Sequence, residues 1–283
     1  MSTSLKQFET DSCVEVWRAD GAPLFTYVFR PATAANESPR PYLHPVYSPG
    51  GDVLTCFRPN DHPWHHALSL TLTSLNGVNF WGGPSHRADD GYKWRDDQGE
   101  QVHVEWLDRS PGSLEHLLHW RTRDGRVLLH ENRSLHVRLI DDGWALEWIS
   151  DFENVSGDTL TAHNYHSLGG LNGSHYTGLQ FRGARGLLDE HGDARIRAVS
   201  ETGAEGDALH GEPSRWVEWH TQSDTSLRRT RIRFLMIGAP ASWFLRKNLP
   251  LVAFAPHREH ALLMSQGERL RLAHRIEFVR LPS

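Results

Sequence analysis

The densest group of chemically active side chains lies in the stretch D-H-P-W-H-H, residues 61–66. It contains Asp61 and three histidines, His62, His65 and His66, and an alternating apolar stretch follows it. Imidazole titrates near neutral pH and can carry a proton to or from a substrate. Asp and Pro suit a turn, but three histidines add nothing to turn geometry. We interpret this stretch as part of a functional site beside a strand.

Two further histidine groups stand next to Pro or Gly, close to strand patterns. His163 and His166 lie in T-A-H-N-Y-H-S-L-G-G, and His257 lies with Glu259 in A-P-H-R-E-H. Residues i and i+2 of a strand share a face, so His163 shares one with Tyr165. We expect histidines of these groups to face the same cleft as those at 61–66.

Two chemical roles stay open for the histidines. In the first, they act as general acid and base on a substrate. In the second, His62, His65, His66 and His163 hold a divalent metal ion, which would serve as a Lewis acid or a redox centre. Neither an H-E-x-x-H nor a C-x-x-C pattern is present, so the histidine pattern is not specific for a metal. The expected cofactor is either none or a divalent metal ion.

Tryptophan and arginine suggest what such a site would bind. The apolar faces of a sugar ring stack on indole, and guanidinium groups bind hydroxyl or carboxylate groups. Trp64, Trp81 and Trp216 are the expected stacking surfaces, and Arg182 is the expected polar partner. With His66, His166 and His257, they form the expected substrate-binding set.

Apolar and polar residues alternate along much of the chain, which indicates half-buried strands. Short turn signals such as A-D-G, R-D-G and D-D-G separate the alternating stretches. The clearest expected strands cover residues 14–18, 24–29, 103–106, 134–139, 144–148, 231–234 and 270–278. No long amphipathic helix is expected, and residues 190–215 are expected to form a long loop. The fold class is therefore all-β, a large antiparallel sandwich, and residues 1–283 are expected to form one domain.

Composition excludes several classes of function. The chain has 30 basic and 35 acidic residues without a block of like charge, so a nucleic-acid partner is not expected. No stretch approaches the roughly 20 apolar residues that span a bilayer, and the N-terminal residues do not resemble a signal peptide. We expect no membrane partner and a cytoplasmic location.

Two cysteines, Cys13 and Cys56, are expected to be free thiols. The motifs of serine hydrolases, kinases and dehydrogenases are absent.

Four stretches resemble, in order and spacing, a bacterial family often labelled "methane oxygenase PmoA". They are R-P-Y-L-H-P-V-Y-S-P-G-G-D-V-L-T, D-H-P-W-H-H-A-L-S-L, N-G-V-N-F-W-G-G and S-R-W-V-E-W. The frequent family form D-H-P-H-H-R matches at His62 and His65, whereas Trp64 and His66 depart from it. The oxygenase activity is not carried over, because such a subunit would need membrane spans.

A second resemblance is to the aldose 1-epimerases, or galactose mutarotases. L-T-A-H-N-Y-H-S-L-G-G is similar to their L-T-N-H-x-Y-F-N-L-A-G, which places His163 on the catalytic histidine. The last strands, with the turn Q-G-E, are similar to that family's strand pair with its P-G-E turn. The resemblance implies a β-supersandwich and a carboxylate that takes a proton from the anomeric hydroxyl. Glu259 is the available carboxylate.

The sequence therefore favours a carbohydrate-active enzyme that acts on a sugar or an oxidised glycoside, as an epimerase, lyase or hydrolase. His163, His62, His65 and Glu259 are the expected catalytic residues. Two alternatives remain open. One is a metal-dependent lyase or oxygenase with a histidine cluster, and the other is a non-catalytic carbohydrate-binding module that needs the tryptophans but not the histidines.

Overall fold

Alternating burial gives the strands of this protein one face toward the interior and one toward solvent. The computed structural model describes residues 4–189, 191, 193, 195–246 and 248–282. In the strand Ser113–Arg121, Leu114, His116, Leu118 and Trp120 are buried, and the residues between them are half-buried. This period of two is the pattern of a strand in a sandwich.

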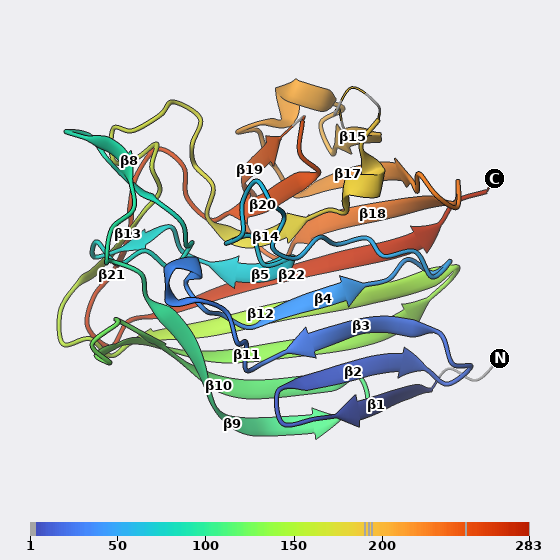
Figure 1. The fold of residues 1–283 in the computed structure, drawn as a ribbon, viewed down its shortest axis with the longest axis horizontal. Coiled ribbons are helices and arrows are strands. Elements are labelled where there is room, and N and C mark those ends of the chain that lie inside the picture. The colour runs from blue at the N-terminus through green and yellow to red at the C-terminus, as the bar shows by residue number, and fades with distance from the viewer. Residues whose placement is uncertain (1–3, 190, 192, 194, 247, 283) are drawn as a thin grey trace.

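Two large antiparallel sheets contain most of the strands (Figure 1). The nine-stranded sheet has the order β1-β2-β3-β4-β5-β14-β20-β19-β16, with bounds Leu5–Glu9, Cys13–Arg18, Pro23–Val28, Tyr42–Val46, Leu68–Thr71, Gly178–Arg182, Leu251–Ala255, Ala241–Arg246 and Pro213–Ser214. The eight-stranded sheet has the order β15-β17-β18-β22-β12-β11-β10-β9, with bounds Ile196–Ser200, Trp216–Gln222, Arg229–Met236, Arg269–Arg280, Gly143–Asn154, Val127–Ile140, Ser113–Arg121 and Glu100–Ser110.

Two small sheets and three short 3-10 helices complete the described elements. The three-stranded sheet β21-β13-β6 comprises Leu262–Met264, Leu160–His163 and Ser74–Leu75. The hairpin of β7 (Ser85–Arg87) and β8 (Gly91–Lys93) projects at one end of the molecule, beside the loop that leads to β14 (Figure 1). The 3-10 helices are Ala35–Glu37, Arg185–Leu187 and Gly206–Leu209.

Aromatic rings from both large sheets meet in the core. Phe25 of β3 lies 5.8 Å from Trp144 of β12, measured between ring centroids. Phe254 of β20 lies 6.0 Å from Phe234 of β18 in the same way. The two sheets therefore pack face to face, as in a β-sandwich.

The core also contains a charged pair between the sheets. Glu131 and Arg133, two residues apart on β11, are both fully buried. The guanidinium donates to both carboxylate oxygens of Glu131 at 2.8 Å, and Trp120 and Ser150 also donate to this carboxylate. Tyr27 of the opposite sheet accepts a further bond from Arg133. This network satisfies a charge that would otherwise be costly to bury.

The structure confirms the all-β antiparallel fold class, and each expected strand coincides with a β-strand, although the one expected at 24–29 ends at Val28. The expected loop at 190–215 is partly wrong, because its described residues include β15, β16 and the helix Gly206–Leu209. Residues 190, 192 and 194 of that segment lie outside the described residues. Cys13 and Cys56 are free. Within the described residues, no helix is long and apolar enough to cross a membrane.

Replacing Glu131 with Gln should destabilise the fold strongly. The variant would leave the Arg133 guanidinium buried without a counter-charge, and breaking a buried pair in this way costs roughly 3–5 kcal/mol. Urea denaturation at neutral pH measures the loss in the free energy of unfolding.

The matched control is Glu153→Gln, which removes the exposed ion pair with Arg269 and should cost roughly 0–1 kcal/mol. Equal stabilities of the two variants would show that the buried pair adds no more than a surface one.

Candidate functional site

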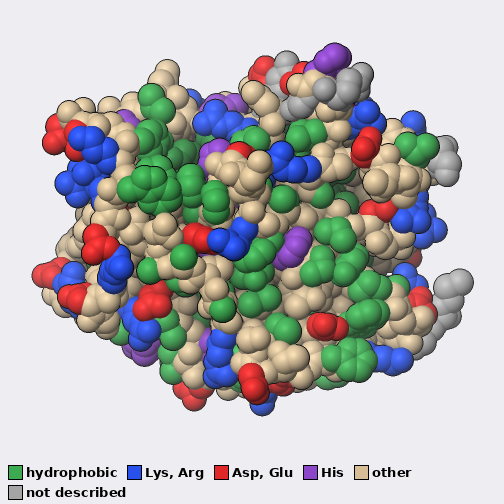
Figure 2. All heavy atoms as spheres, viewed as in Figure 1, with side chains coloured by type: hydrophobic (Ala, Val, Ile, Leu, Met, Phe, Trp, Pro, Cys, Tyr) green, Lys and Arg blue, Asp and Glu red, His purple; other side chains and the backbone are tan. Residues whose placement is uncertain are grey.

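A cavity of 350 Å³ opens on the face of the nine-stranded sheet near the β7–β8 hairpin. Its lining comes from segments far apart in the chain: the 61–66 stretch, residues 81–84, β8, the loop before β14, and the ends of β19 and β20. Figure 2 shows hydrophobic side chains gathered in this region of the surface, with basic and histidine side chains beside them. The residues that line the cavity are His62, Trp64, His65, Trp81, Gly82, Pro84, Tyr92, Leu171, Ser174, Tyr176, Phe244, Arg246, Leu249 and Leu251.

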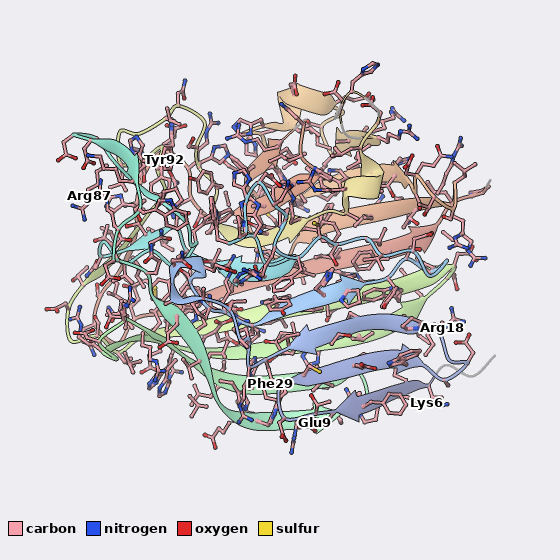
Figure 3. The ribbon with its side chains drawn as sticks, viewed as in Figure 1. Lys6, Glu9, Arg18, Phe29, Arg87 and Tyr92 are labelled. Atoms are coloured by element: carbon pink, nitrogen blue, oxygen red, sulfur yellow. The ribbon has the colours of Figure 1, made fainter. Side chains whose placement is uncertain are left out.

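Aromatic rings form a large part of the cavity wall. Trp81 lies 4.7 Å from Tyr176, measured between ring centroids, and 5.7 Å from His65. The hydroxyl of Tyr92, which is labelled on β8 in Figure 3, is 2.8 Å from that of Tyr176. This contact joins the hairpin to the loop before β14. Trp64 adds a further indole from the 61–66 stretch.

His62 carries the clearest arrangement for proton transfer. Its Nδ1 is 2.8 Å from Oδ2 of Asp61, and its ring stacks on His65 with centroids 4.6 Å apart. A carboxylate that accepts from Nδ1 fixes the tautomer and leaves Nε2 as the proton acceptor. The side chain of His62 is 38% exposed, so a ligand in the cavity can reach it.

Asp61 is held as an anion in this pair. Burial raises its pKa, but the hydrogen bond from His62 and the positive charge of Arg182 outweigh that effect, and the pKa lies below its usual value. Arg182 and Arg185 both donate to its carboxylate, at 3.2 and 2.7 Å. Asp61 therefore orients the imidazole and offers negative charge when that ring is protonated.

His65 is a neutral member of the site. Its ring is almost fully buried, and burial is the largest cause that holds its pKa well below the ordinary value, followed by the charge of His62. Its Nδ1 has no hydrogen-bond partner among the described residues. A neutral imidazole beside the cavity can donate or accept one hydrogen bond to a ligand.

Arg40 ties the backbone of the cavity wall together. Its guanidinium is fully buried and donates to the carbonyl oxygens of Trp64 and Trp81, at 2.9 and 3.1 Å. The carbonyl oxygens of Glu37 and Ser38 accept two more bonds. Burial lowers the pKa of Arg40 to about 9, so it remains charged at neutral pH.

His66 is directed away from the cavity, toward Glu37. Its Nε2 donates to Oε2 of that buried carboxylate at 3.1 Å, and Arg58 binds the same group. Burial lowers the pKa of His66 to about 3, so the ring is neutral at physiological pH. Burial raises the pKa of Glu37, but hydrogen bonds from His66 and Arg58 bring it below its usual value. His66 therefore supports the cavity wall from the side opposite the cavity.

The turn at Gly82 and Gly83 makes room for the indole of Trp64. A Cβ atom at Gly83 would lie 2.4 Å from the indole ring, and one at Gly82 would lie 2.5 Å from the carbonyl oxygen of Glu37. Both residues also have positive φ angles, of 92° and 72°. Glycine is required here by backbone conformation and by close approach together.

The other two predicted histidine groups meet each other but do not line this cavity. His166 is 2.8 Å from Glu259, and Asn164 donates to the carbonyl oxygen of His257 at 3.2 Å. His163 contacts Ser167 at 3.3 Å, and burial lowers its pKa. The structure therefore places His163, His166, His257 and Glu259 outside the lining of this cavity.

The structure also gives the positions of Trp216, Arg182 and the expected metal ligands. Trp216 lies on β17 of the other sheet, where Arg233 covers its ring at 4.9 Å, so it is not a wall of the cavity. Arg182 is buried and pairs with Asp61 beneath the site. The expected metal ligands do not converge: across the part of the chain that the structure describes, no three His, Cys, Asp or Glu side chains are placed to hold a metal ion.

Sequence reasoning did not find several residues of the site. Tyr92, Tyr176 and Arg246 carry no local motif, and only the pairing of distant strands brings them together. Asp61 could have been predicted from the sequence, because a carboxylate directly before a histidine can orient that histidine. Arg40 stands in P-R-P-Y-L-H-P, one of the stretches that carries the first family resemblance.

Comparison with known proteins gives the family. The model of a family of unknown function (DUF6807) matches residues 15–280. The chain belongs to this family. The methane oxygenase label does not appear in its description. No curated protein sequence matches the chain significantly.

Solved structures with some similarity include proteins that act on sugars. An α-galactosidase from Lactobacillus brevis has 9% identity and a TM-score of 0.42, with 98% of this chain and 39% of that chain covered. The galactosidase domain of the α-galactosidase-sucrose kinase AgaSK has 8% identity and a TM-score of 0.40, with 99% and 41% covered. A galactose mutarotase related enzyme from Lactobacillus acidophilus has 8% identity and a TM-score of 0.37, with 97% of each chain covered. The DUF6807 chain thus spans about two-fifths of the length of the two galactosidase chains.

Replacing Gly83 with Ala should displace Trp64. The new Cβ would overlap the indole, and overpacking of this kind costs roughly 1–3 kcal/mol. Near-ultraviolet circular dichroism reports the change around the tryptophan, and thermal denaturation reports the loss of stability.

Gly91→Ala is the matched control for backbone strain. Gly91 has a φ of 71°, close to that of Gly83, but no atom lies within 4 Å of its added Cβ. Identical spectra and stabilities for the two variants would contradict the proposed role of the close approach.

Proposed function

We propose that this DUF6807 protein is a carbohydrate-active enzyme in which His62, oriented by Asp61, transfers a proton to or from a sugar. The observation that carries the proposal is the Asp61–His62 pair at an aromatic cavity. The proposal keeps the sequence-based prediction of an enzyme that uses acid–base chemistry on sugars. It assigns the proton transfer to His62 in place of His163.

The cavity suits a sugar ring in size and in lining. Pockets for small molecules measure roughly 300–1,000 Å³ and are mostly apolar with a few polar groups. The volume of 350 Å³ lies at the small end of that range. Trp64, Trp81 and Tyr176 offer ring faces to the C–H surfaces of a sugar, and His65 and Ser174 offer hydrogen bonds to its hydroxyls.

The proposed chemistry begins with Nε2 of His62. As a base, it would take a proton from a hydroxyl or from an acidic carbon of the bound sugar, and the Asp61 carboxylate would stabilise the imidazolium that forms. As an acid, the same imidazolium would return the proton to a ring oxygen or to a leaving group on the same side of the sugar. Anomer exchange and syn elimination both fit this cycle with His62 as the one titrating group, whereas inversion at a carbon would need a second proton donor on the opposite face.

The binding-module alternative rests on the same aromatic wall. Such a protein would hold a sugar without any turnover, and the Asp61–His62 pair would serve only to present hydrogen bonds. A variant that removes the base but keeps the rings separates the two functions.

Replacing His62 with Gln should abolish turnover and leave sugar binding and folding intact. General acid–base catalysis contributes roughly 10²–10⁴-fold, so at least that loss is expected. Proton NMR in D₂O on a panel of aldoses, uronates and glycosides detects anomer exchange, epimerisation, elimination and deuterium uptake at carbon. His163→Ala is the matched comparison and should retain activity.

Loss of activity in His163→Ala with normal activity in His62→Gln would contradict the assignment to His62. Sugar binding without turnover by the wild-type protein across the panel would favour the binding module.

Asp61→Asn tests whether Asp61 positions His62. The variant should lower kcat by about 10- to 100-fold with little change in KM, because the loss of an orienting partner affects the proton transfer more than binding. Asp141→Asn, in the exposed turn between β11 and β12, is the control and should behave as wild type. An increase of KM alone would instead make Asp61 a binding residue.

A further inference from the structure

The charge of the cavity lining has one sign. Among the described residues of the lining, Arg246 is the one charged side chain apart from the histidines, and neither Asp nor Glu is present. The guanidinium of Arg246 lies over the ring of Phe244, 4.8 Å from its centroid. Among the described residues, no carboxylate pairs with it. An arginine stacked on an aromatic ring and left without a counter-ion is pre-organised to receive an anion.

Strand register places a second guanidinium on the same side of the sheet. Arg246 of β19 pairs with Leu251 of β20, and Leu251 pairs in turn with Arg182 of β14. Side chains of directly paired residues project from the same face. Because Arg246 and Leu251 line the cavity, Arg182 lies on the cavity side as well, beneath its floor.

The neighbouring row of the sheet adds unsatisfied polar groups. Phe244 of β19 pairs with Ala253 of β20, and Ala253 pairs in turn with Gln180 of β14. Phe244 lines the cavity. The amide of Gln180 and the Nε and Nη1 atoms of Arg182 are buried and have no hydrogen-bond partner in the described structure. Both side chains are at least nine-tenths buried. Buried polar groups of this kind normally have partners, so their lack of one points to a ligand or to ordered water.

Positive charges beside the cavity outnumber negative ones. Asp61 is shared between Arg182 and Arg185, so one carboxylate faces two guanidinium groups. Arg40 donates only to uncharged oxygen atoms, four carbonyls and the hydroxyl of Ser69. The cavity floor is therefore electropositive in a chain whose formal net charge is −5.

We propose that the cavity takes a sugar that carries a carboxylate, a uronate or an aldonate, with Arg246 as the partner of that carboxylate. The inference rests on the proposed function and deepens it, because it names the substrate class of the same site. The planar fork of arginine matches a carboxylate with two parallel hydrogen bonds. One exposed guanidinium suits one negative charge better than the two of a phosphate.

The test compares matched ligands on the full chain by isothermal titration calorimetry. The pairs are galacturonate with galactose and glucuronate with glucose, and glucose 6-phosphate is a further arm. The uronates should bind at least about tenfold more tightly than the neutral sugars, and added salt should narrow that difference because it screens the exposed guanidinium.

The variants are Arg246→Gln and Arg246→Lys, with Arg138→Gln on the exposed face of β11 as control. Arg246→Gln should remove the preference for uronates, because it should weaken the binding of uronates much more than that of neutral sugars. Arg246→Lys should restore part of the preference, and Arg138→Gln should match wild type. Thermal denaturation of each variant confirms that it is folded.

The outcomes separate this inference from the proposed function. Equal binding of uronates and neutral sugars, or a preference that survives in Arg246→Gln, overturns the carboxylate assignment and leaves the role of His62 standing. Tighter binding of the sugar phosphate than of the uronates overturns the choice of carboxylate over phosphate. Binding of neither class overturns both the inference and the proposed function.

Discussion

The register of β14, β20 and β19 is the constraint on which the candidate site depends. Arg182, Leu251 and Arg246 stand in one row across these strands, on the face that bears the cavity. A shift of one residue between any two of the strands would turn a whole set of side chains to the opposite face. The buried rings on the core face, such as Phe181 and Phe254, oppose such a shift because it would expose them. The hydrophobic core therefore fixes the polar geometry of the site.

Charged groups within the site are arranged as pairs that each serve a second purpose. Asp61 binds Arg182 and Arg185 and at the same time orients His62. Glu37 binds Arg58 and His66 and supports the wall behind the cavity. Each carboxylate has a lowered pKa and so remains ionised across the physiological range. Neither carboxylate would therefore hold the proton in the proposed reaction, in which His62 is the proton carrier.

Much of the fold was predictable from the sequence because alternation in strands is local. The stretches at 144–148 and 270–278 show their period of two directly, and they pair with each other in the structure. The 61–66 stretch could be identified as a candidate site because its residue types are too reactive for a plain turn. The prediction for His163, which lies outside the cavity lining, has a different origin. Its assignment came from a resemblance over eleven residues, and a short motif does not fix which side of a loop faces a cavity.

The residues that sequence reasoning missed depend on contacts across long chain distances. Tyr92 and Tyr176 are 84 positions apart and meet through their hydroxyls. Arg246 ends a strand whose partner, β20, sets its position relative to His62. Alternation identifies a strand, but it does not tell which other strand will lie beside it. The choice among many possible antiparallel neighbours is a property of the whole sandwich.

Arg40 holds the backbone of the cavity wall by bonds that do not depend on which side chains the wall carries. The atoms that it binds at positions 64 and 81 are backbone carbonyl oxygens, which every amino acid supplies. An indole at either position can therefore be exchanged for another side chain without loss of the bond that holds the segment in place. Proteins built on this plan can diverge in what they recognise while the scaffold of the cavity stays the same, since selectivity and architecture are encoded by different atoms of the same residues.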